Sequence, residues 1–220
     1  MERAELDLIG SRLEALYTCI IHDVLRSRSE DTGVLSRGIR SLAGGSKVGG
    51  VVYTMEGRSD PDVGEHESLL LWTEFLSEVP PGTVVVSQAN DHEVAHMGEL
   101  SAETLHHRGV RGFIVDGGSR DTRSILDLGF PVWCRYVTPS DLVGRWRIDS
   151  LGEPITIGGV TIRSGDWVLA DEDGVVVVPA ASAEEVVSEA EVQASTEDQI
   201  RAAILSGVSP KDAYLEHGKF

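Results

Sequence analysis

Residues 112–121, with the sequence GFIVDGGSRD, end an apolar run on an arginine that is followed directly by an aspartate. Arg120 offers a planar fork of N–H donors that suits a carboxylate or an enolate oxygen. Asp121 offers a hard oxygen ligand of the kind that Mg²⁺ or Mn²⁺ prefers. Gly117 and Gly118 give the backbone room to turn and to approach a small ligand closely. The segment therefore predicts either an active site or a surface turn with a local salt bridge.

Residues 92–96 form a second candidate motif, HEVAH, which has the HExxH spacing of zinc peptidases. On a helix this spacing places His92 and His96 on one face and Glu93 in position to act as a general base. The motif follows an apolar run typical of a strand, and Gly98 comes two residues after the second histidine, so a continuous helix is not expected. A zinc peptidase is thus the minor alternative. Both histidines are expected to be exposed in a loop, or else one of them lines a neighbouring site.

The composition is that of an ordinary globular protein, with 220 residues, 41% of them hydrophobic and 25% charged. This length is enough for one well-packed domain. The net charge of −17 argues against binding to the phosphate backbone of nucleic acids, which requires a positive surface. Cys19 and Cys134 lie in apolar runs and are expected to be buried free thiols, as in a cytoplasmic protein. The N-terminus is unlike a signal peptide, and no apolar run approaches the roughly 18 residues of a membrane span, so we expect a soluble protein.

Hydrophobic periodicity predicts an α/β fold, with residues 1–220 forming a single domain. Leu6, Ile9, Leu13 and Leu16 have helical spacing, Thr18 is available to cap a second helix, and Gly109 is expected to end a later one. The predicted helices cover residues 2–16, 18–27, 66–79, 98–110 and 120–129. The predicted strands fall within residues 45–57, 80–90, 112–118 and 131–137.

The pattern changes after residue 139. Residues 153–179 contain short β-rich runs separated by Gly-Gly, Ser-Gly and Asp-Gly turns, which predicts antiparallel strands. The acidic cluster at residues 171–174 lacks the spacing of a calcium-binding EF-hand loop and favours a tight hairpin turn. Residues 182–206 predict a long acidic helix followed by a short tail from residue 210, so that residues 182–220 would form a helical arm.

Taken in order, these motifs resemble the family of the regulator of ribonuclease activity A. That family includes class II pyruvate aldolases acting on 4-hydroxy-4-methyl-2-oxoglutarate and 4-carboxy-4-hydroxy-2-oxoadipate. The resemblance runs through YTCIIHDVL, GIRSL, GGVVYT and PGTVVV, is most specific over residues 97–135, and ends in GGVTIRSGDWVLADEDGVVVVP. It implies an RraA-like α/β fold of the swivelling β/β/α type, assembled as a trimer or as a hexamer made of two trimers.

The resemblance also implies how pyruvate binds. Its oxygens would lie against the backbone amides of a short loop formed by Gly98, Glu99, Leu100 and Ser101. Arg120 would hold the pyruvate carboxylate and 2-oxo group and stabilise the enolate. The acidic residue of this loop is often aspartate in the family, so Glu99, which is counted with the catalytic residues, departs from the pattern by one methylene.

The metal site implied by the resemblance is shared between subunits. Asp121 would hold Mg²⁺ or Mn²⁺, partly through water. A glutamate on the C-terminal arm of a neighbouring subunit would complete the site, and Glu197 is the best match. The same predicted helix also carries Glu184, Glu185, Glu189 and Glu191.

These residue types suit a retro-aldol cleavage that releases pyruvate. The reaction needs a base for the C4 hydroxyl proton, and coordination to a divalent ion lowers the pKa of water enough for that role. Enolate charge would develop next to Arg120. The same chemistry implies oxaloacetate decarboxylation, because loss of CO₂ also leaves pyruvate enolate. The three lysines, Lys47, Lys211 and Lys219, lie outside these motifs, which disfavours Schiff-base catalysis.

A second class of function is a non-catalytic regulator that binds ribonuclease E, as the resemblance and the acidic composition allow. An Arg120–Asp121 pair beside the Gly98 loop would be unnecessary in a pure binding protein, so the sequence favours the enzyme. Arg145 and Arg147 would either bind a distal carboxylate of the substrate or serve only at the surface.

Overall fold

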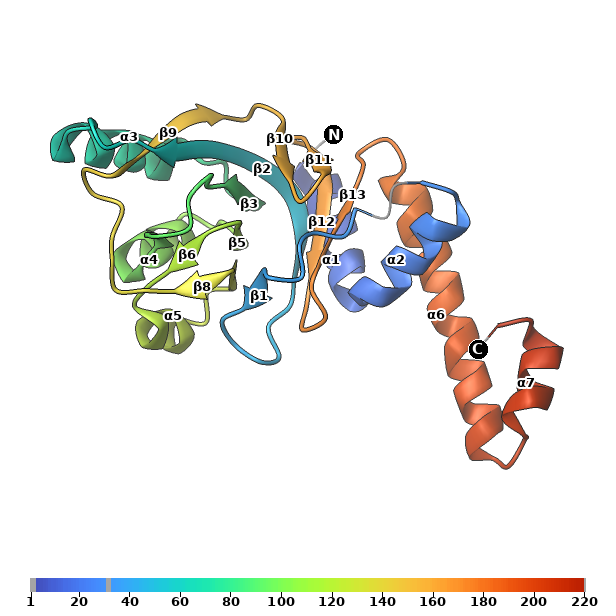
Figure 1. Ribbon diagram of the computed structural model, residues 1–220. Coiled ribbons are helices and arrows are strands. Elements are labelled where there is room, and N and C mark those ends of the chain that lie inside the picture. Colours follow the sequence, from blue (N-terminus) through green and yellow to red (C-terminus); the bar gives the residue numbers. More distant parts are fainter. Residues whose placement is uncertain (1–2, 31–32, 220) are drawn as a thin grey trace.

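The computed structural model describes residues 3–30 and 33–219, and the side chains of its first helix from Leu8 onward. Of the helix predicted over residues 2–16, residue 2 and the side chain of Leu6 lie outside that description. The helices are α1 (Arg3–Ala15), α2 (Thr18–Ser27), α3 (Glu65–Glu78), α4 (Glu99–His107), α5 (Thr122–Leu128), α6 (Ala183–Leu205) and α7 (Pro210–His217). A curved sheet separates α3, α4 and α5 from α1, α2 and α6, and the end of α6 projects with α7 away from the body (Figure 1).

The large sheet is built around the long strand β2 (Val48–Ser59). Its order is β1-β7-β5-β3-β2-β12-β13, with β9 also paired to β2, and the run from β7 to β2 is parallel. The other strands of this sheet are β1 (Arg40–Ser41), β3 (Thr83–Gln88), β5 (Gly112–Val115), β7 (Val132–Cys134), β9 (Trp146–Leu151), β12 (Trp167–Ala170) and β13 (Val175–Val178). The α/β fold class is confirmed.

Antiparallel pairing joins β1 to β7 and both β9 and β12 to β2, and it also forms two hairpins. The hairpin of β10 (Ile155–Ile157) with β11 (Val160–Ile162) is antiparallel, and so is that of β12 with β13. This confirms the prediction for residues 153–179. In the second hairpin the N–H of Asp171 donates to the carbonyl of Gly174 at 3.0 Å, so the acidic cluster is the expected turn.

Three very short strands form a separate parallel sheet, in the order β4-β6-β8. They are β4 (Ala95–Met97), β6 (Gly118–Ser119) and β8 (Tyr136–Val137). Each one follows the neighbouring parallel strands β3, β5 and β7 along the chain. Because the three short strands run in the same direction, their carboxyl ends meet at one edge, which is where ligands bind in many α/β proteins.

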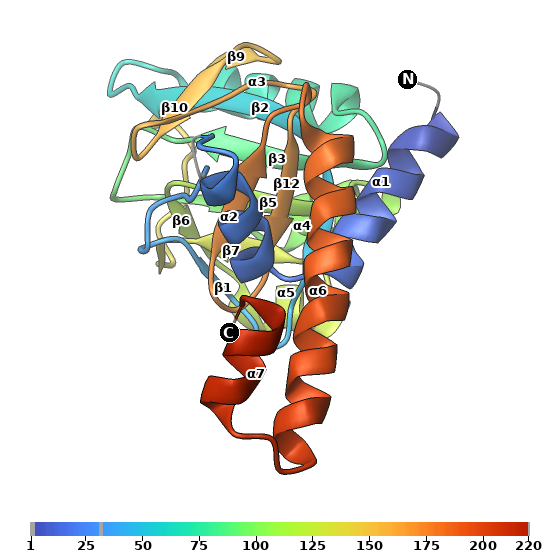
Figure 2. The same cartoon turned by 90° about the vertical axis from the view of Figure 1, so that its right-hand side faces the viewer.

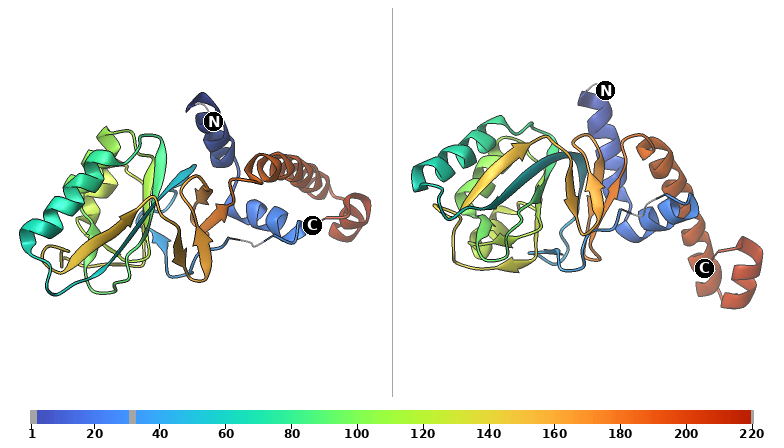
Figure 3. Two further views of the ribbon diagram at one scale, coloured as in Figure 1. Left: turned by 90° about the horizontal axis from the view of Figure 1, so that it is seen from above. Right: turned by 45° about the horizontal axis from the view of Figure 1, so that its top comes forward.

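The core consists of three apolar clusters that the curved sheet divides. One lies under α3, α4 and α5, one under the β10–β11 hairpin, and one against α1, α2 and α6. This separation of the helices is also visible from above (Figure 3). Trp133, Trp146 and Trp167 are each at most 1% exposed and hold the clusters against the sheet.

Two details of α2 differ from the prediction. Tyr17, not Thr18, is the N-cap residue, and Thr18 instead donates from its N–H and hydroxyl to the buried Asp171 carboxylate at 2.8 and 2.7 Å. Cys134 is buried as expected, whereas Cys19 is exposed. Cys19 lies on the side of α2 opposite to the buried Ile21 and Leu25, so an apolar run alone does not imply that it is buried.

The C-terminal arm begins on the body and then leaves it. Arg12 pairs with Glu184 and Glu191 at 2.6 and 2.8 Å, while Arg28 pairs with Glu185 and Glu189 on the same helix. Beyond this region α6 and α7 extend past the body (Figure 2). The stretch predicted as a tail is the helix α7, which starts with Pro210 in its first turn and with the Ser209 hydroxyl accepting from the Asp212 N–H.

No helix within the described ranges is long and apolar enough to cross a membrane.

Candidate active site

The predicted site residues follow the carboxyl ends of β4 and β6. Gly98 separates β4 from α4, while Arg120 and Asp121 separate β6 from α5. The N–H of Arg120 donates to the carbonyl of Met97 at 2.8 Å, and the N–H of Glu99 donates to Oδ2 of Asp121 at 3.0 Å. These bonds connect the two loops, so the structure brings the glycine loop and the Arg–Asp pair together.

Gly98 is required by the closeness of this contact. A Cβ atom at this position would lie 2.8 Å from Oδ2 of Asp121 and 3.1 Å from Nε of Arg120. Gly117 and Gly118 have a different role from the one expected. A Cβ atom on Gly117 would lie 2.6 Å from the ring of His96, and one on Gly118 would lie 2.5 Å from the ring of Tyr136. Those two glycines make room for neighbouring side chains and not for a ligand.

Two cavities share Arg120 and Asp121. The larger, of about 380 Å³, is lined by Leu69, Trp72, Thr73, Leu76, Ala95, His96, Met97, Gly98, Glu99, Leu100, Ser101, Arg120, Asp121, Asp141, Leu142 and Val143. The smaller, of about 300 Å³, adds Thr122, Val137, Thr138 and Pro139 to the pair. All the residues expected to bind pyruvate therefore line the larger cavity.

Asp141, which the sequence interpretation missed, is a further charged residue of the site. Its Oδ2 lies 3.3 Å from Nη1 of Arg120, and its Oδ1 lies 3.2 Å from Nη2 of Arg145. Burial raises the pKa of Asp141, but hydrogen bonds from Arg145 and from the Val143 N–H, with the charge of Arg120, outweigh it and lower this pKa below its ordinary value. Asp141 therefore holds Arg120 as a carboxylate. Its position after the third short strand was the available signal.

Asp121 has a strained backbone, with φ 54° and ψ 36° at the N-terminal end of α5. This left-handed conformation is uncommon outside glycine, although aspartate and asparagine tolerate it best. It places the carboxylate next to Glu99 N–H and 3.4 Å from Nε of Arg120. The Asp121 side chain remains 38% exposed, so a carboxylate oxygen is accessible at the cavity.

The donor set suits a hydrated divalent ion better than a fully enclosed metal site. In the part of the chain that the structure describes, no three His, Cys, Asp or Glu side chains are grouped to hold a metal. Mg²⁺ commonly keeps several waters and takes one or two carboxylates together with substrate oxygens. Asp121, a hard and partly exposed oxygen donor beside the cavity, fits that pattern.

The HExxH motif is not a zinc site. Ala95–Met97 is a strand, so His92 and His96 do not share a helix face, and the zinc-peptidase interpretation is wrong. His92 is exposed as expected, but His96 is fully buried and lines the cavity. Residues 95–97 form a fully buried strand and not an exposed loop, so this side chain is enclosed.

His96 connects β4 and β6, the two strands that carry the site loops. Its Nδ1 accepts the N–H of Gly118 at 3.3 Å, its Nε2 lies 3.6 Å from Oδ1 of Asp91, and its ring packs edge-on against Trp146. Burial lowers the pKa of His96 to about 4, so the ring is neutral at neutral pH. A neutral histidine can accept from β6 on one nitrogen and carry its proton on the other, which helps to fix β4 against β6.

Helix α3 supports the amide loop from the side. The indole N–H of Trp72 donates to the hydroxyl of Ser101 at 2.9 Å, and Trp72 is itself 6% exposed. Leu100, one residue earlier, is 76% exposed. The loop is thus anchored through Ser101, while Leu100 remains open at the mouth of the cavity.

Glu197 lies outside this site in the single chain. It is on α6, which the curved sheet separates from α4 and β6 (Figure 1). Its carboxylate accepts from the Tyr17 hydroxyl and lies 3.1 Å from Nζ of Lys219. The structure of one chain does not join Glu197 to Asp121, and its role in a neighbouring site stays a prediction.

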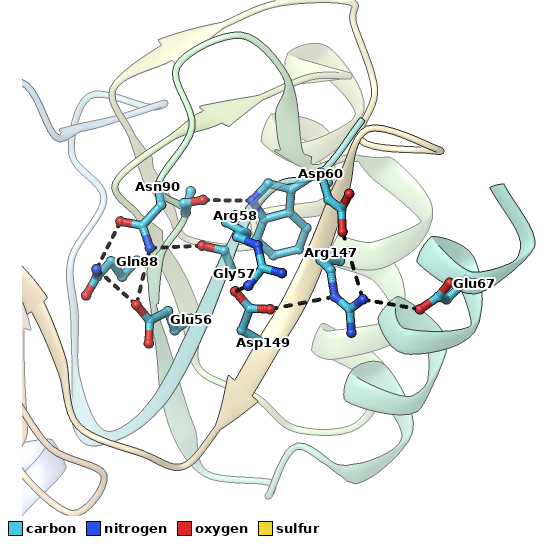
Figure 4. Close-up of polar contacts among 11 residues, drawn as sticks. Glu56, Gly57, Arg58, Asp60, Glu67, Gln88, Asn90, Arg147 and Asp149 are labelled. Carbon is cyan, nitrogen blue, oxygen red and sulfur yellow. Dashed lines mark hydrogen bonds and ion pairs between the residues drawn. The ribbon is translucent and has the colours of Figure 1, made fainter. Parts of the chain in front are cut away.

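Arg145 and Arg147 do not line either cavity. Arg147 lies among the carboxylates of Glu67, Asp149 and Asp60, at 3.3, 3.6 and 3.9 Å (Figure 4). Arg145 is engaged by Asp141 and, at 2.7 Å, by the Ser140 hydroxyl. In this structure both guanidinium groups therefore neutralise the protein's own acids.

Comparison with known proteins assigns the family. Residues 18–177 match the RraA-like family, which is described as Aldolase/RraA. This chain belongs to the RraA-like family. A relative from Halalkalibacterium halodurans, named "Putative 4-hydroxy-4-methyl-2-oxoglutarate aldolase", is 32% identical over 98% of this chain and 97% of its own length.

Solved structures share the fold described above. Streptomyces coelicolor RraAS2, described as an unusual member of the RNase ES inhibitor RraA protein family, matches with a TM-score of 0.81 and 29% identity over 92% of this chain and 99% of that one. An uncharacterized protein from Pseudomonas syringae matches with a TM-score of 0.83 and 27% identity over 94% of this chain and 96% of that one. The resemblance found in the sequence is confirmed.

Proposed function

We propose that this RraA-like protein is a divalent-metal-dependent lyase of the 4-hydroxy-4-methyl-2-oxoglutarate aldolase type, which cleaves a 4-hydroxy-2-oxo acid to pyruvate. The observation that carries the proposal is the placement of Arg120 and Asp121 against the N-terminal amides of α4 at one cavity. The name of the Halalkalibacterium halodurans relative supports the same reaction class.

The pyruvate half of the substrate carries negative charge throughout the reaction. Arg120 would bind its carboxylate and 2-oxo oxygens, and the N–H groups of Leu100 and Ser101 in the first turn of α4 would favour the same anion. In the cleavage, the C4 hydroxyl loses its proton, the C3–C4 bond breaks, and the electron pair passes to the pyruvate enolate. Arg120 is already held in place by Asp141 and Asp121, so it can stabilise this charge without reorganising.

Asp121 would hold the metal ion, Mg²⁺ or Mn²⁺, with Glu197 of a neighbouring copy as the proposed second carboxylate. When bound, such an ion supplies positive charge at the enolate oxygen and lowers the pKa of water. The contribution of the protein is to fix the Asp121 carboxylate through the Glu99 N–H, at a backbone conformation that keeps it beside Arg120.

Oxaloacetate decarboxylation is proposed as a companion activity. Loss of CO₂ from C4 sends the electron pair into the same pyruvate enolate, which Arg120 is placed to stabilise. The leaving carboxylate needs no cation of its own, because binding it tightly would oppose its departure.

The proposal is tested on reactions that depend on the pyruvate half alone. Pyruvate release from oxaloacetate and exchange of the pyruvate methyl protons in D₂O would be measured with Mg²⁺ and with EDTA. Arg120→Ala is expected to lose about 10²–10³ in kcat/KM, the usual effect of removing one group that stabilises an oxyanion. Asp121→Asn, which retains a residue suited to the left-handed backbone, is expected to lose the response to metal.

Arg123→Ala is the matched control. Arg123 is 86% exposed and pairs with Asp127 on the same helix, so its loss should leave both reactions unchanged. Full activity in Arg120→Ala would contradict the proposal.

A non-catalytic regulator of ribonuclease E is the second candidate, supported by the similarity to RraAS2 and by the net charge of −17. Direct binding to purified ribonuclease E, undiminished in Arg120→Ala and accompanied by no turnover in the wild type, would favour this alternative over the lyase.

A further inference from the structure

We propose that the natural substrate carries an uncharged, apolar substituent at C4, so that it is a mono-anionic 4-hydroxy-2-oxo acid. The second product would then be an aldehyde or ketone without a carboxylate. The inference rests on the proposed function and goes further, because the name of the Halalkalibacterium halodurans relative implies a substrate with a second carboxylate at this end.

The charges around the cavities do not suit a second substrate carboxylate. Among the described residues that line the two cavities, Arg120 is the sole arginine, and no lysine is present. His96, the one histidine of the lining, has its pKa lowered to about 4 by burial and is neutral. Glu99, Asp121 and Asp141 place three carboxylates in the larger cavity. Once Arg120 holds the carboxylate of the pyruvate half and Asp121 holds the divalent ion, a distal carboxylate would face Glu99 and Asp141.

Three arginines of neighbouring segments are engaged in ion pairs with the protein's own acids. Arg145 is paired with Asp141, and Arg147 with Glu67 and Asp149 (Figure 4). On the side of the smaller cavity, the exposed Arg123 pairs with Asp127 four residues along its helix. Recruiting Arg147 or Arg123 would take Glu67 or Asp127 out of the ion pair described here, and recruiting Arg145 would leave Asp141 with Arg120 alone, which offsets part of the gain.

The walls of the larger cavity are apolar on two sides. Helix α3 contributes Leu69, Trp72 and Leu76, and the segment after Asp141 contributes Leu142 and Val143. Leu69 is 44% exposed and thus keeps apolar surface free to cover a ligand. An alkyl substituent at C4 would bury this surface, and such pockets typically gain about tenfold in kcat/KM for each added methyl group.

The smaller cavity is also lined mainly by apolar or uncharged residues. Beyond Arg120 and Asp121, it is lined by Thr122, Val137, Thr138 and Pro139, and Val137 is 57% exposed. Apart from Arg120 and the carboxylates, the C4 substituent therefore meets apolar or uncharged groups in either cavity.

The test compares substrates that differ only at C4. We would measure kcat/KM for 4-hydroxy-2-oxopentanoate, 4-hydroxy-2-oxohexanoate and 4-hydroxy-4-methyl-2-oxoglutarate. The two alkyl substrates are expected to be cleaved at least about tenfold more efficiently than the diacid, and the hexanoate more efficiently than the pentanoate. An equal or higher value for the diacid would overturn the inference.

A charge introduced into the wall provides the second measurement. Thr73 lies on the exposed side of α3, lines the larger cavity, and bonds through its hydroxyl only to the carbonyls of its own helix. Thr73→Arg is expected to shift the ratio of kcat/KM toward the diacid by about tenfold, as a new ion pair would. Thr73→Gln, which is similar in length but neutral, should leave the ratio unchanged. A wild-type preference for the alkyl substrates with no shift in Thr73→Arg would also count against the inference.

Exchange of pyruvate methyl protons in D₂O distinguishes failure of the inference about the C4 substituent from failure of the proposed lyase function. Exchange that depends on Arg120, together with preference for the diacid, would overturn the apolar substituent but retain the lyase. Absence of both exchange and cleavage would remove the proposed function, and the inference with it.

Discussion

At the scale of single residues, the position of the Arg120–Asp121 pair requires that residue 98 has no Cβ atom. Gly98→Ala would place a methyl group 2.8 Å from the Asp121 carboxylate and 3.1 Å from Arg120. The two site side chains would have to move, so kcat/KM for pyruvate release is expected to fall by about 10²-fold or more, the usual effect of misplacing such groups. The change in thermal stability should be small, because the collision involves exposed side-chain ends.

Gly44→Ala is the control for this prediction. A Cβ atom at Gly44 meets nothing within 4 Å, so that variant should keep full activity. An active Gly98→Ala protein would show that the pair does not need the position described here.

His96 leads to a prediction about pH. Its pKa is about 4 in the folded protein and near 6.5 in an unfolded chain. As the pH falls from 7 to 4, the unfolded state takes up the proton first, so the free energy of unfolding decreases. The decrease is at most about 3 kcal/mol from this residue alone. Urea unfolding across this range measures it.

The same titration in His96→Gln should lack this contribution, since glutamine binds no proton. His92→Gln changes an exposed histidine and should retain the wild-type pH dependence. Identical pH dependence in all three proteins would refute the assignment to His96.

At the scale of elements, α3 and α4 are joined through the Trp72–Ser101 hydrogen bond. Ser101→Ala leaves the indole N–H of a nearly buried tryptophan without that partner. The free energy of unfolding is expected to fall by about 1–3 kcal/mol, the cost of an unsatisfied buried donor. Ser101→Thr keeps the hydroxyl and should recover most of the loss. Equal stability of the alanine variant and the wild type would mean that the bond contributes nothing.

The sequence predicted the larger elements well because each of them carries several periods of its hydrophobic pattern. Helix α3 and strands β3 and β5 follow from apolar spacing alone. The strands that position the site are too short for periodicity: β6 and β8 contain two residues each. His96 was accordingly assigned to a loop, and Asp141, at the corresponding end of the third short strand, was overlooked.

The roles of single residues likewise divide into those that the sequence could predict and those that it could not. Arg120, Asp121 and the Gly98 loop were identified because their types and order match a known family, and the structure places them together. Gly117 and Gly118 could not be interpreted correctly, because the rings that need their space come from β4 and β8. Contacts between segments distant in sequence leave no local pattern.

At the scale of the whole molecule, the arm raises a question of assembly. Glu197 lies away from the Arg120 site of its own chain, yet the predicted metal site includes it. If sites are shared between copies, Asp121→Asn and Glu197→Gln impair different partners of the same site. Mixing the two inactive proteins under exchange conditions should then restore part of the pyruvate release, because some assembled sites receive two intact residues.

The control for this mixing experiment uses two variants of one loop. Asp121→Asn mixed with Arg120→Ala should recover nothing, since a site assembled from either chain lacks a residue of the pair. No recovery with Glu197→Gln, or full activity of that variant alone, would place the arm outside the reaction.

Arg120 and Asp121 are consecutive at the end of β6, whereas the amide loop belongs to β4. The chain therefore fixes the guanidinium and the carboxylate close to each other, and backbone hydrogen bonds hold this pair against the amide loop. A 2-oxo acid that contacts both loops would add a further connection between the ends of β4 and β6. Binding of this ligand should thus make the small sheet of β4, β6 and β8 more rigid, and its release should make that sheet less rigid. The large sheet should stay unchanged.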